Sequence, residues 1–189
     1  MIKILKKIGQ FILETIQAIV MALSIFIIIY LFLFQPHQVI GSSMYPTLKD
    51  SEFLLTDKIS YRFNDPKRGD IIVFKAPSTE PCSEIECEYI KRIIGIPGDN
   101  VKVSKGHVYV NDQLLPEAYL SGDLITSSGS VLQEGFNIIV PDDYYLPLGD
   151  NRPNSRDGRE FGPIPKESII GKAFFRYWPI NEAGLIKNL

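Results

Sequence analysis

A long apolar segment near the N-terminus constrains the fold of this chain more than any other feature. Residues 11–34 are apolar except for a few polar and tyrosine positions, and the part from Ala18 to Phe34 reads AIVMALSIFIIIYLFLF. A helix of about 20 apolar residues crosses the hydrocarbon core of a bilayer. We therefore expect residues 11–34 to form a transmembrane anchor, with a short tail of residues 1–10 before it and one domain, residues 35–189, after it.

The distribution of lysines predicts which way this anchor is oriented. Lys3, Lys6 and Lys7 precede the segment, and the next Lys or Arg is Lys49. By the positive-inside rule the N-terminus is cytoplasmic and the rest lies on the exported side. A cleaved signal peptide is the alternative, but its apolar core is only about 7–15 residues long and an A-x-A-like site follows it. The sequence QPHQVI at 35–40 offers no such site, which favours the anchor.

The charge balance after residue 34 argues against nucleic-acid binding. The whole chain has 20 Lys and Arg residues against 22 Asp and Glu residues. Three of these cations and one anion precede residue 35, so the remainder has a formal charge of −4. A nucleic-acid-binding domain usually carries a basic patch or stripe, and none is evident here.

Two cysteines, Cys82 and Cys87, lie close together in the sequence PCSEIEC. In an oxidising exported compartment such a pair favours a disulfide that closes the short loop. A metal site is the alternative, but the chain has only two histidines, and His37 lies beside the apolar segment. Because zinc sites use sets of Cys and His ligands, we expect a disulfide, no bound metal and no cofactor.

The sequence after residue 34 is typical of a mainly antiparallel β domain. Short apolar runs bounded by Gly, Pro or Asp occur at 71–74, 90–96 and 169–178, as expected for strands. Residues 101–110 alternate around Lys105-Gly106, which predicts a hairpin with its turn there and a solvated His107 at its mouth. Residues 121–137 are polar and rich in Gly and Ser, which predicts a mobile surface loop.

Ser43 and Lys91 are candidates for a nucleophile and its base. Ser43 lies in GSSMYPTL just after the apolar segment, and Lys91 lies in the apolar sequence EYIKRIIGI. Lysine replaces histidine in Ser-Lys variants of the serine protease triad. A lysine accepts a proton only when neutral, and burial lowers its pKa from a usual value of about 10.4. From these residues alone, Lys91 fits equally well as a solvated cation on an edge strand, and Ser43 as ordinary loop chemistry.

Four segments resemble the sequence boxes of type I signal peptidases and occur in the same order. They are GSSMYPTL (41–48), RGDIIVF (68–74), YIKRIIGIPGD (89–99) and GDNRPNSRDGREFGPI (149–164). With the preceding apolar segment, the resemblance covers most of the chain. It implies a compact, barrel-like antiparallel β fold after one transmembrane helix, with a reduced sub-lobe around residues 100–142, in a plasma or thylakoid membrane.

The resemblance also implies roles for individual residues. Ser43 matches the nucleophile, Lys91 the general base, and Ser155 a supporting serine that hydrogen-bonds the lysine. Phe74 and Tyr89 match side chains that pack on the lysine and keep it dry. Four charged residues match two ion pairs that hold the surrounding loops without reacting: Arg92 with Asp150, and Arg159 with Asp157.

A further group of residues matches the walls of shallow substrate pockets for small side chains at positions −1 and −3 of the signal peptide. Ordinary core packing is the alternative for each of them. The group consists of Val39, Ile40, Met44, Tyr89 and Ile90.

The chain departs from the family pattern at two positions. Gly41 stands where some members have a serine that assists the oxyanion hole, so the hole must use the Ser43 N–H and another donor, either water or a backbone amide near Gly41. Pro147 stands where well-known members have a flexible apolar side chain against the lysine, which puts the desolvation of Lys91 in question.

The resemblance implies a membrane-bound serine endopeptidase that removes N-terminal signal peptides from exported precursor proteins. Its partners are those precursors and membrane lipid, without nucleic acid or metal. A self-cleaving Ser-Lys protease similar to the SOS-response repressors is disfavoured by the apolar segment and the missing DNA-binding module. A membrane-tethered β domain that binds a partner without catalysis predicts that Ser43 and Lys91 are dispensable.

Overall fold

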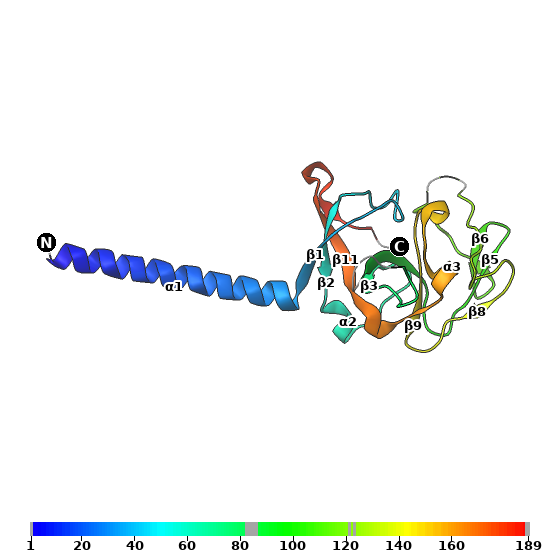
Figure 1. Ribbon diagram of the computed structural model, residues 1–189, viewed down its shortest axis with the longest axis horizontal. Coiled ribbons are helices and arrows are strands. Elements are labelled where there is room, and N and C mark those ends of the chain that lie inside the picture. Colours follow the sequence, from blue (N-terminus) through cyan, green and yellow to red (C-terminus); the bar gives the residue numbers. More distant parts are fainter. Residues whose placement is uncertain (1, 82–86, 121, 123, 188–189) are drawn as a thin grey trace.

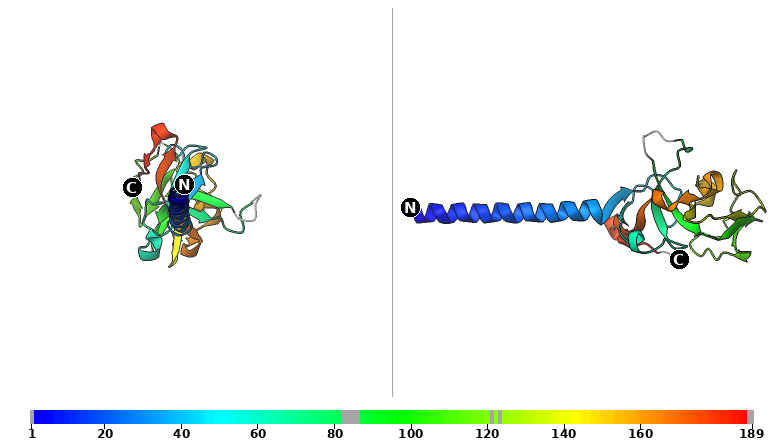
Figure 2. Two further views of the ribbon diagram at one scale, coloured as in Figure 1. Left: turned by 90° about the vertical axis from the view of Figure 1, so that its left-hand side faces the viewer. Right: turned by 90° about the horizontal axis from the view of Figure 1, so that it is seen from below.

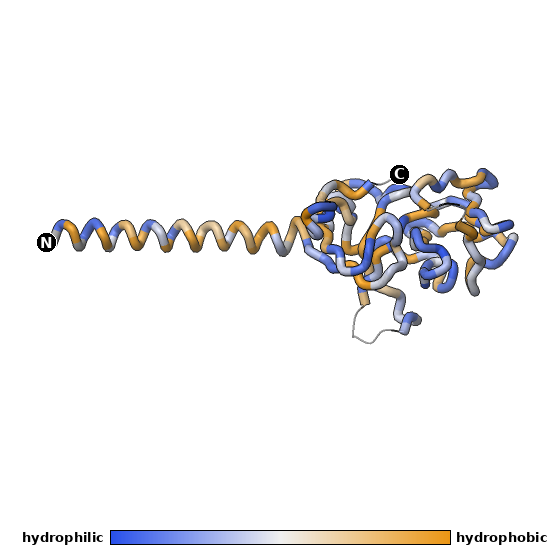
Figure 3. The backbone as a smooth tube through the Cα atoms, turned by 90° about the horizontal axis from the view of Figure 1, so that it is seen from above, coloured by the Kyte–Doolittle hydropathy of each residue, from blue (hydrophilic) through white to orange (hydrophobic). Residues whose placement is uncertain are grey.

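A long N-terminal helix, α1 (Ile2–Phe32), leads into a β domain in the computed structural model (Figure 1). The structure describes residues 2–81, 87–120, 122 and 124–187. Within α1, the segment Lys6–Tyr30 is long and apolar enough to cross a membrane, and none of it is buried against the protein. Figure 3 shows that hydrophobic residues dominate the half of the helix nearest the β domain.

Helix α1 differs from the predicted anchor, residues 11–34, at both ends. It begins earlier, at Ile2, because Ile, Leu and Lys are compatible with a helix and no Pro interrupts them. It ends at Phe32, and strand β1 (Phe34–Gln38) begins two residues later. Pro36 explains this end, because it lacks a backbone N–H and disfavours helical geometry at the residue before it.

The β domain is built around one large antiparallel sheet. Its strand order is β1-β2-β11-β3-β4-β9-β10, with β12 paired to β11. The sheet curls strongly, as Figures 1 and 2 show. The remaining strands of this sheet are β2 (Phe53–Asp57), β3 (Ile71–Lys75), β4 (Glu88–Gly95), β9 (Tyr144–Leu148), β10 (Ile164–Pro165), β11 (Ile169–Trp178) and β12 (Gly184–Leu185).

Register irregularities explain the curl of this sheet. Strand β11 shifts register against β2 at two points and against β3 once, and β4 shifts against β9 between Ile93 and Gly95. Each shift bends the strand and increases its twist. The loop after β1 and the loop after β9 both contact the middle of β4, through Lys91 and Arg92.

A second, smaller antiparallel sheet lies at the end of the molecule farthest from α1 (Figure 1). The predicted hairpin is confirmed here: Ser104 pairs with His107, and both Lys105 and Gly106 have positive φ. His107 is exposed, as expected at the mouth of the hairpin. The strands of this sheet, in the order β7-β6-β5-β8, are β5 (Asn100–Ser104), β6 (His107–Val110), β7 (Gln113–Leu114) and β8 (Ile138–Ile139).

The segment predicted as a mobile surface loop, residues 121–137, packs against the fold in part. Leu132 is fully buried with the apolar side chains of the small sheet. The Thr126 hydroxyl accepts a hydrogen bond from Arg152 at 2.6 Å. The prediction was wrong for these residues. It rested on the polar, Gly-rich composition of the segment, and composition does not show that one or two of its side chains are buried. Ser121 and Asp123 of this segment lie outside the described residues.

Apolar clusters lie on both faces of β3 and β4, and short helical segments connect the strands of the domain. One face packs Ile72, Phe74 and Ile93 together, and the other packs Ile71 with the residues of the loop after β1. Alternation along β4 therefore decides which cluster each of its side chains joins. The helical segments are α2 (Ser60–Phe63), η1 (Arg152–Asn154), α3 (Gly158–Phe161), η2 (Lys166–Ser168) and η3 (Ile180–Glu182).

Candidate active site

The loop that carries Ser43 joins β1 to β2 and is fixed by backbone hydrogen bonds. Its ends are closed by Val39 N–H donating to the Glu52 carbonyl and Ser51 N–H donating to the Val39 carbonyl, both at 2.8 Å. Within the loop, the Leu48 N–H donates to the Met44 carbonyl at 2.9 Å. Ser43 stands immediately before this turn, with its side chain directed at β4.

Gly41 shapes the entry to this loop. Its φ is +85°, which favours glycine, and its N–H donates to the Asp50 carboxylate at 2.6 Å. The Gly41 amide is therefore occupied and is no free donor for an oxyanion. Within the described part of the chain the Ser43 N–H has no acceptor, so that donor is available.

Lys91 reaches Ser43 from the middle of β4. The Lys91 Nζ lies 2.8 Å from the Ser43 Oγ and donates a second hydrogen bond to the Ile90 carbonyl at 3.0 Å. The residue is only 5% exposed. The Tyr89 ring, two positions away on the same face, has its centroid 5.2 Å from the Nζ. Ser43 and Lys91, 48 residues apart in the chain, are thus within proton-transfer distance.

Burial lowers the pKa of Lys91 from its usual 10.5 to about 8. Desolvation of the ammonium is the largest cause, and the carboxylates of Asp157 and Asp150 oppose it by favouring the charged form. Neither carboxylate forms an ion pair with Lys91 among the described residues. A sizeable fraction of the lysine is consequently neutral near pH 8. Pro147, which put this desolvation in question, lies opposite Ile93 in the pairing of β9 with β4.

Ser155 lies close to this pair, but it does not form the hydrogen bond with Lys91 that the sequence analysis led us to expect. Its Oγ is buried and has no hydrogen-bond partner among the described residues. Gly149 separates it from the Ser43 loop: a Cβ at position 149 would overlap the Ser155 side chain and lie 2.6 Å from the Ser43 carbonyl oxygen. The Lys91 ammonium donates two hydrogen bonds, to Ser43 and to the Ile90 carbonyl, and can donate a third.

Arg92, the residue after Lys91, faces the other side of β4 and forms a buried ion pair with Asp150. The two nitrogens Nε and Nη2 donate to the two carboxylate oxygens at 2.9 and 2.8 Å. Thr47 also donates to Asp150, at 2.5 Å, which ties the loop after β1 to the loop after β9. The Asn151 N–H reinforces this connection by donating to the Ser43 carbonyl at 3.0 Å.

Asp157 and Arg159 form the second buried ion pair, with Arg159 Nε donating to Asp157 Oδ1 at 2.8 Å. Asp157 caps α3 by accepting the Arg159 N–H and also accepts the Gly149 N–H at 2.9 Å. Arg159 donates in turn to the carbonyls of Arg152 and Ser155. This pair holds both ends of the segment from Gly149 to Arg159.

The residues expected to form substrate pockets are divided between core and surface. Val39 and Met44 are buried in the cluster that also contains Ile71, and Ile90 packs partly against it. Ile40 is 86% exposed beside the Ser43 loop. Only Ile40 is fully accessible, so Val39 and Met44 form the floor beneath the site rather than open walls.

Two further arginine contacts, of the buried Arg152 and the exposed Arg156, were not predicted from the sequence. Arg152 donates to Glu117 at 3.1 Å and to the Tyr119 hydroxyl at 3.2 Å, and the Tyr119 ring lies 4.1 Å from the Arg92 guanidinium. Arg156 forms a two-point contact with Glu80. The arginines lie within the segment 149–164, but no spacing links them to carboxylates 35 and 76 residues away.

Neither the two histidines nor Cys87 is among the described hydrogen-bond partners of Ser43 and Lys91. The His37 Nδ1 contacts the Thr56 hydroxyl at 2.8 Å, and its Nε2 lies 3.0 Å from Glu88 Oε2 without hydrogen-bond alignment. Desolvation lowers the pKa of His37. Cys87 is disulfide-bonded. Cys82, the other cysteine of the chain, lies outside the described residues.

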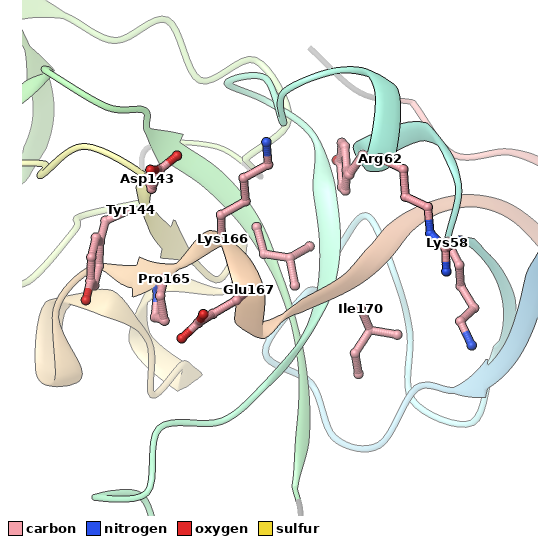
Figure 4. A pocket seen from close by; sticks show the side chains of 10 residues that line it. Lys58, Arg62, Asp143, Tyr144, Pro165, Lys166, Glu167 and Ile170 are labelled. Atoms are coloured by element: carbon pink, nitrogen blue, oxygen red, sulfur yellow. The ribbon is translucent and has the colours of Figure 1, made fainter. Parts of the chain in front are cut away.

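A separate pocket lies on another part of the surface and contains none of the expected site residues (Figure 4). Lys58 and Arg62 point side by side at one end, and Asp143 and Tyr144 lie at the other. Lys166 pairs with Asp65 at its edge. The pocket therefore has no connection to the Ser43–Lys91 pair.

Comparisons with known proteins indicate the family of the chain. Residues 12–178 match the family described as "Signal peptidase, peptidase S26". The chain is 42% identical over 174 residues to "Probable signal peptidase I-2" of Synechocystis, covering 92% of this chain and 77% of the relative. It is 35% identical over 182 residues to "Signal peptidase IB" of Staphylococcus aureus, covering 90% and 92%.

A crystal structure of a signal peptidase I from Enterococcus faecalis aligns with a TM-score of 0.46 at 30% identity, covering 58% of this chain and 97% of that one. The family match extends over most of the chain and includes both Ser43 and Lys91. The chain therefore belongs to the signal peptidase family, peptidase S26.

Proposed function

We propose that this signal peptidase cleaves precursor proteins with Ser43 as its nucleophile and Lys91 as its general base. The observation that carries this proposal is the 2.8 Å contact between Ser43 Oγ and Lys91 Nζ. The burial of Lys91 without a directly paired carboxylate among the described residues supports it, because desolvation favours the neutral amine that a base requires. A non-catalytic tethering domain has no need for such a pair.

The reaction follows from the placement of these groups. Neutral Lys91 accepts the Ser43 proton as the Ser43 Oγ attacks the scissile carbonyl carbon. The free Ser43 N–H stabilises the negative charge on the carbonyl oxygen, and water is the second donor that we propose. Lys91 then gives its proton to the leaving amine. A water molecule, deprotonated by Lys91, hydrolyses the acyl-enzyme and releases Ser43.

The substrate is an exported precursor whose signal peptide is cut after small residues at −1 and −3. We propose that the extended segment binds beside Ile40 and the Ser43 loop, where main-chain hydrogen bonds give affinity. We propose that the small side chains at −1 and −3 lie against Val39 and Met44, which are buried and expose little surface. Ser155 supports the reaction by accepting a hydrogen bond from the Lys91 ammonium and holding its orientation.

We also propose that α1 anchors the enzyme in the membrane with its N-terminus cytoplasmic and residues 35–189 on the exported side. Lys3, Lys6 and Lys7 before the span support this orientation. β1 begins two residues after α1, so the domain lies close to the membrane lipid. Signal peptides are themselves cut where they leave the bilayer.

The test uses purified full-length protein in detergent with a signal-peptide-bearing precursor, followed by sequencing of the new N-terminus. Wild type is expected to cut once after the signal peptide. Ser43→Ala and Lys91→Arg are expected to be inactive, because the first lacks the hydroxyl and the second stays protonated at any usable pH. Ser42→Ala, a matched control at the neighbouring serine, is expected to retain activity. Cleavage by Lys91→Arg would disprove the dyad.

A further inference from the structure

Glu80 is a buried carboxylate in the arm that joins β3 to β4, described at residues 76–81 and 87, and the dyad chemistry makes no use of it. The arm continues the β3–β4 pairing, since the Ala76 N–H donates to the Cys87 carbonyl at 2.8 Å. It projects from the body of the domain (Figure 2, right). The Glu80 side chain is only 1% exposed. A buried carboxylate is costly unless its oxygens are paired, so its partners indicate what it stabilises.

The partners of Glu80 are Arg156 and Tyr89, and each is linked to the surroundings of Lys91. Arg156 Nε donates to Oε2 at 2.6 Å and Arg156 Nη2 donates to Oε1 at 3.0 Å, a two-point contact with a fixed orientation. Arg156 directly follows Ser155. The Tyr89 hydroxyl donates to the same Oε2 at 3.3 Å. Tyr89 is the residue whose ring faces the Lys91 Nζ at 5.2 Å.

We propose that Glu80 is a positioning residue for the Ser43–Lys91 dyad, because it fixes the Tyr89 ring against Lys91 and the Ser155 loop through Arg156. The proposal rests on the assignment of Lys91 as the base. Phe74 and Phe161 support the Tyr89 ring from its other sides, with ring centroids 6.1 and 6.3 Å away. Glu80 is therefore the polar contact that determines where the hydroxyl end of Tyr89 lies.

The proposal predicts a change in the chemistry of Lys91 and not only in stability. The groups around Lys91 are Ser43, Tyr89, and the carboxylates of Asp150 and Asp157. If the Tyr89 ring loosens, water reaches the ammonium and the pKa of Lys91 rises toward its usual value. The acid limb of the pH–rate profile then moves to higher pH. Simple destabilisation of the fold does not move that limb.

The experiment measures kcat and KM on one signal-peptide substrate between about pH 6 and pH 10. Glu80→Gln is expected to lower kcat at neutral pH about tenfold, to leave KM within about twofold, and to shift the acid limb upward. Tyr89→Phe, which removes only the hydroxyl, is expected to shift it in the same direction by less. Arg156→Lys is expected to retain more activity than Arg156→Ala. Asp65→Asn breaks the exposed ion pair with Lys166 and serves as the matched control, with a wild-type profile.

The outcomes separate this proposal from the dyad assignment. A wild-type kcat and acid limb in Glu80→Gln, even with a lower melting temperature, would make Glu80 purely structural and overturn the proposal. If Glu80→Gln fails to fold, unchanged profiles in Tyr89→Phe and Arg156→Lys would overturn it equally. An active Lys91→Arg enzyme would instead refute the dyad, whatever the Glu80 variants show.

Discussion

Lys91 and Arg92 are neighbours on β4, both are buried, and their surroundings differ in one decisive way. Arg92 has a carboxylate partner, Asp150, that matches its guanidinium at two points. Among the described residues, Lys91 has only a hydroxyl and a carbonyl within hydrogen-bond distance. A buried cation with a matched anion stays charged and holds segments together. A buried cation without one is pushed toward its neutral form, which is what a base requires.

The sharpest way to test this comparison is to remove each charge without removing the bulk of the side chain. Arg92→Met leaves Asp150 buried and unpaired, and we expect it to lower the free energy of unfolding by about 3–5 kcal/mol. Lys91→Met removes a cation that the fold destabilises, so we expect an inactive protein that is more stable than wild type by up to about 3 kcal/mol. Denaturant unfolding of the two variants provides the measurement.

The size of the Lys91 effect on stability also depends on pH. The folded pKa of about 8 lies below the usual 10.5, so the unfolded chain binds more protons between these values. Wild-type stability should therefore rise across that window, and the advantage of Lys91→Met should disappear toward its upper end. A destabilised Lys91→Met protein at neutral pH would contradict the comparison.

Ser155→Ala tests whether the Lys91 ammonium needs the Ser155 hydroxyl as a third hydrogen-bond acceptor. We expect kcat to fall about 10²-fold with little change in KM, because in the proposed mechanism the Ser155 hydroxyl orients the lysine. Single-turnover and steady-state kinetics at saturating peptide provide the measurement. A loss confined to KM would place Ser155 in substrate binding instead.

The pH dependence of catalysis distinguishes a neutral from a charged Lys91. With a pKa of about 8, activity should rise through that pH, and activity at pH 7 should lie about tenfold below the alkaline plateau. Asp150→Asn removes a carboxylate that favours the charged form, so its acid limb should lie at lower pH than that of wild type. A limb that moves upward would show that the electrostatic balance around Lys91 has been misread.

The smallest effect is expected at the cysteines. Replacing Cys82 and Cys87 together by Ser should lower stability by about 2 kcal/mol, the value for a short closed loop. Turnover should stay near wild type, because Glu80 keeps its contacts with Arg156 and Tyr89. Peptide cleavage and thermal unfolding of the double variant check this, and loss of activity on chelation would indicate a metal instead.

The sequence predicted those parts of the molecule that local patterns determine. The Lys105-Gly106 turn fixed a hairpin, and the sequence around Ser43 and Lys91 matched two family boxes that the structure brings to 2.8 Å. The partners of Glu80 and Glu117 were not predictable, because tertiary folding alone decides which of many surface carboxylates becomes buried beside an arginine. The burial of Leu132 was not predicted, because it too depends on tertiary folding.

Gly149 has a consequence for anyone who wishes to redesign this enzyme. Three segments meet there, and the space for even a methyl group is already filled by the Ser155 side chain and the Ser43 carbonyl. Position 149 therefore offers no room for a larger residue. New cleavage preferences have to be engineered from the open rim, where Ile40 is exposed and can be exchanged without disturbing the junction.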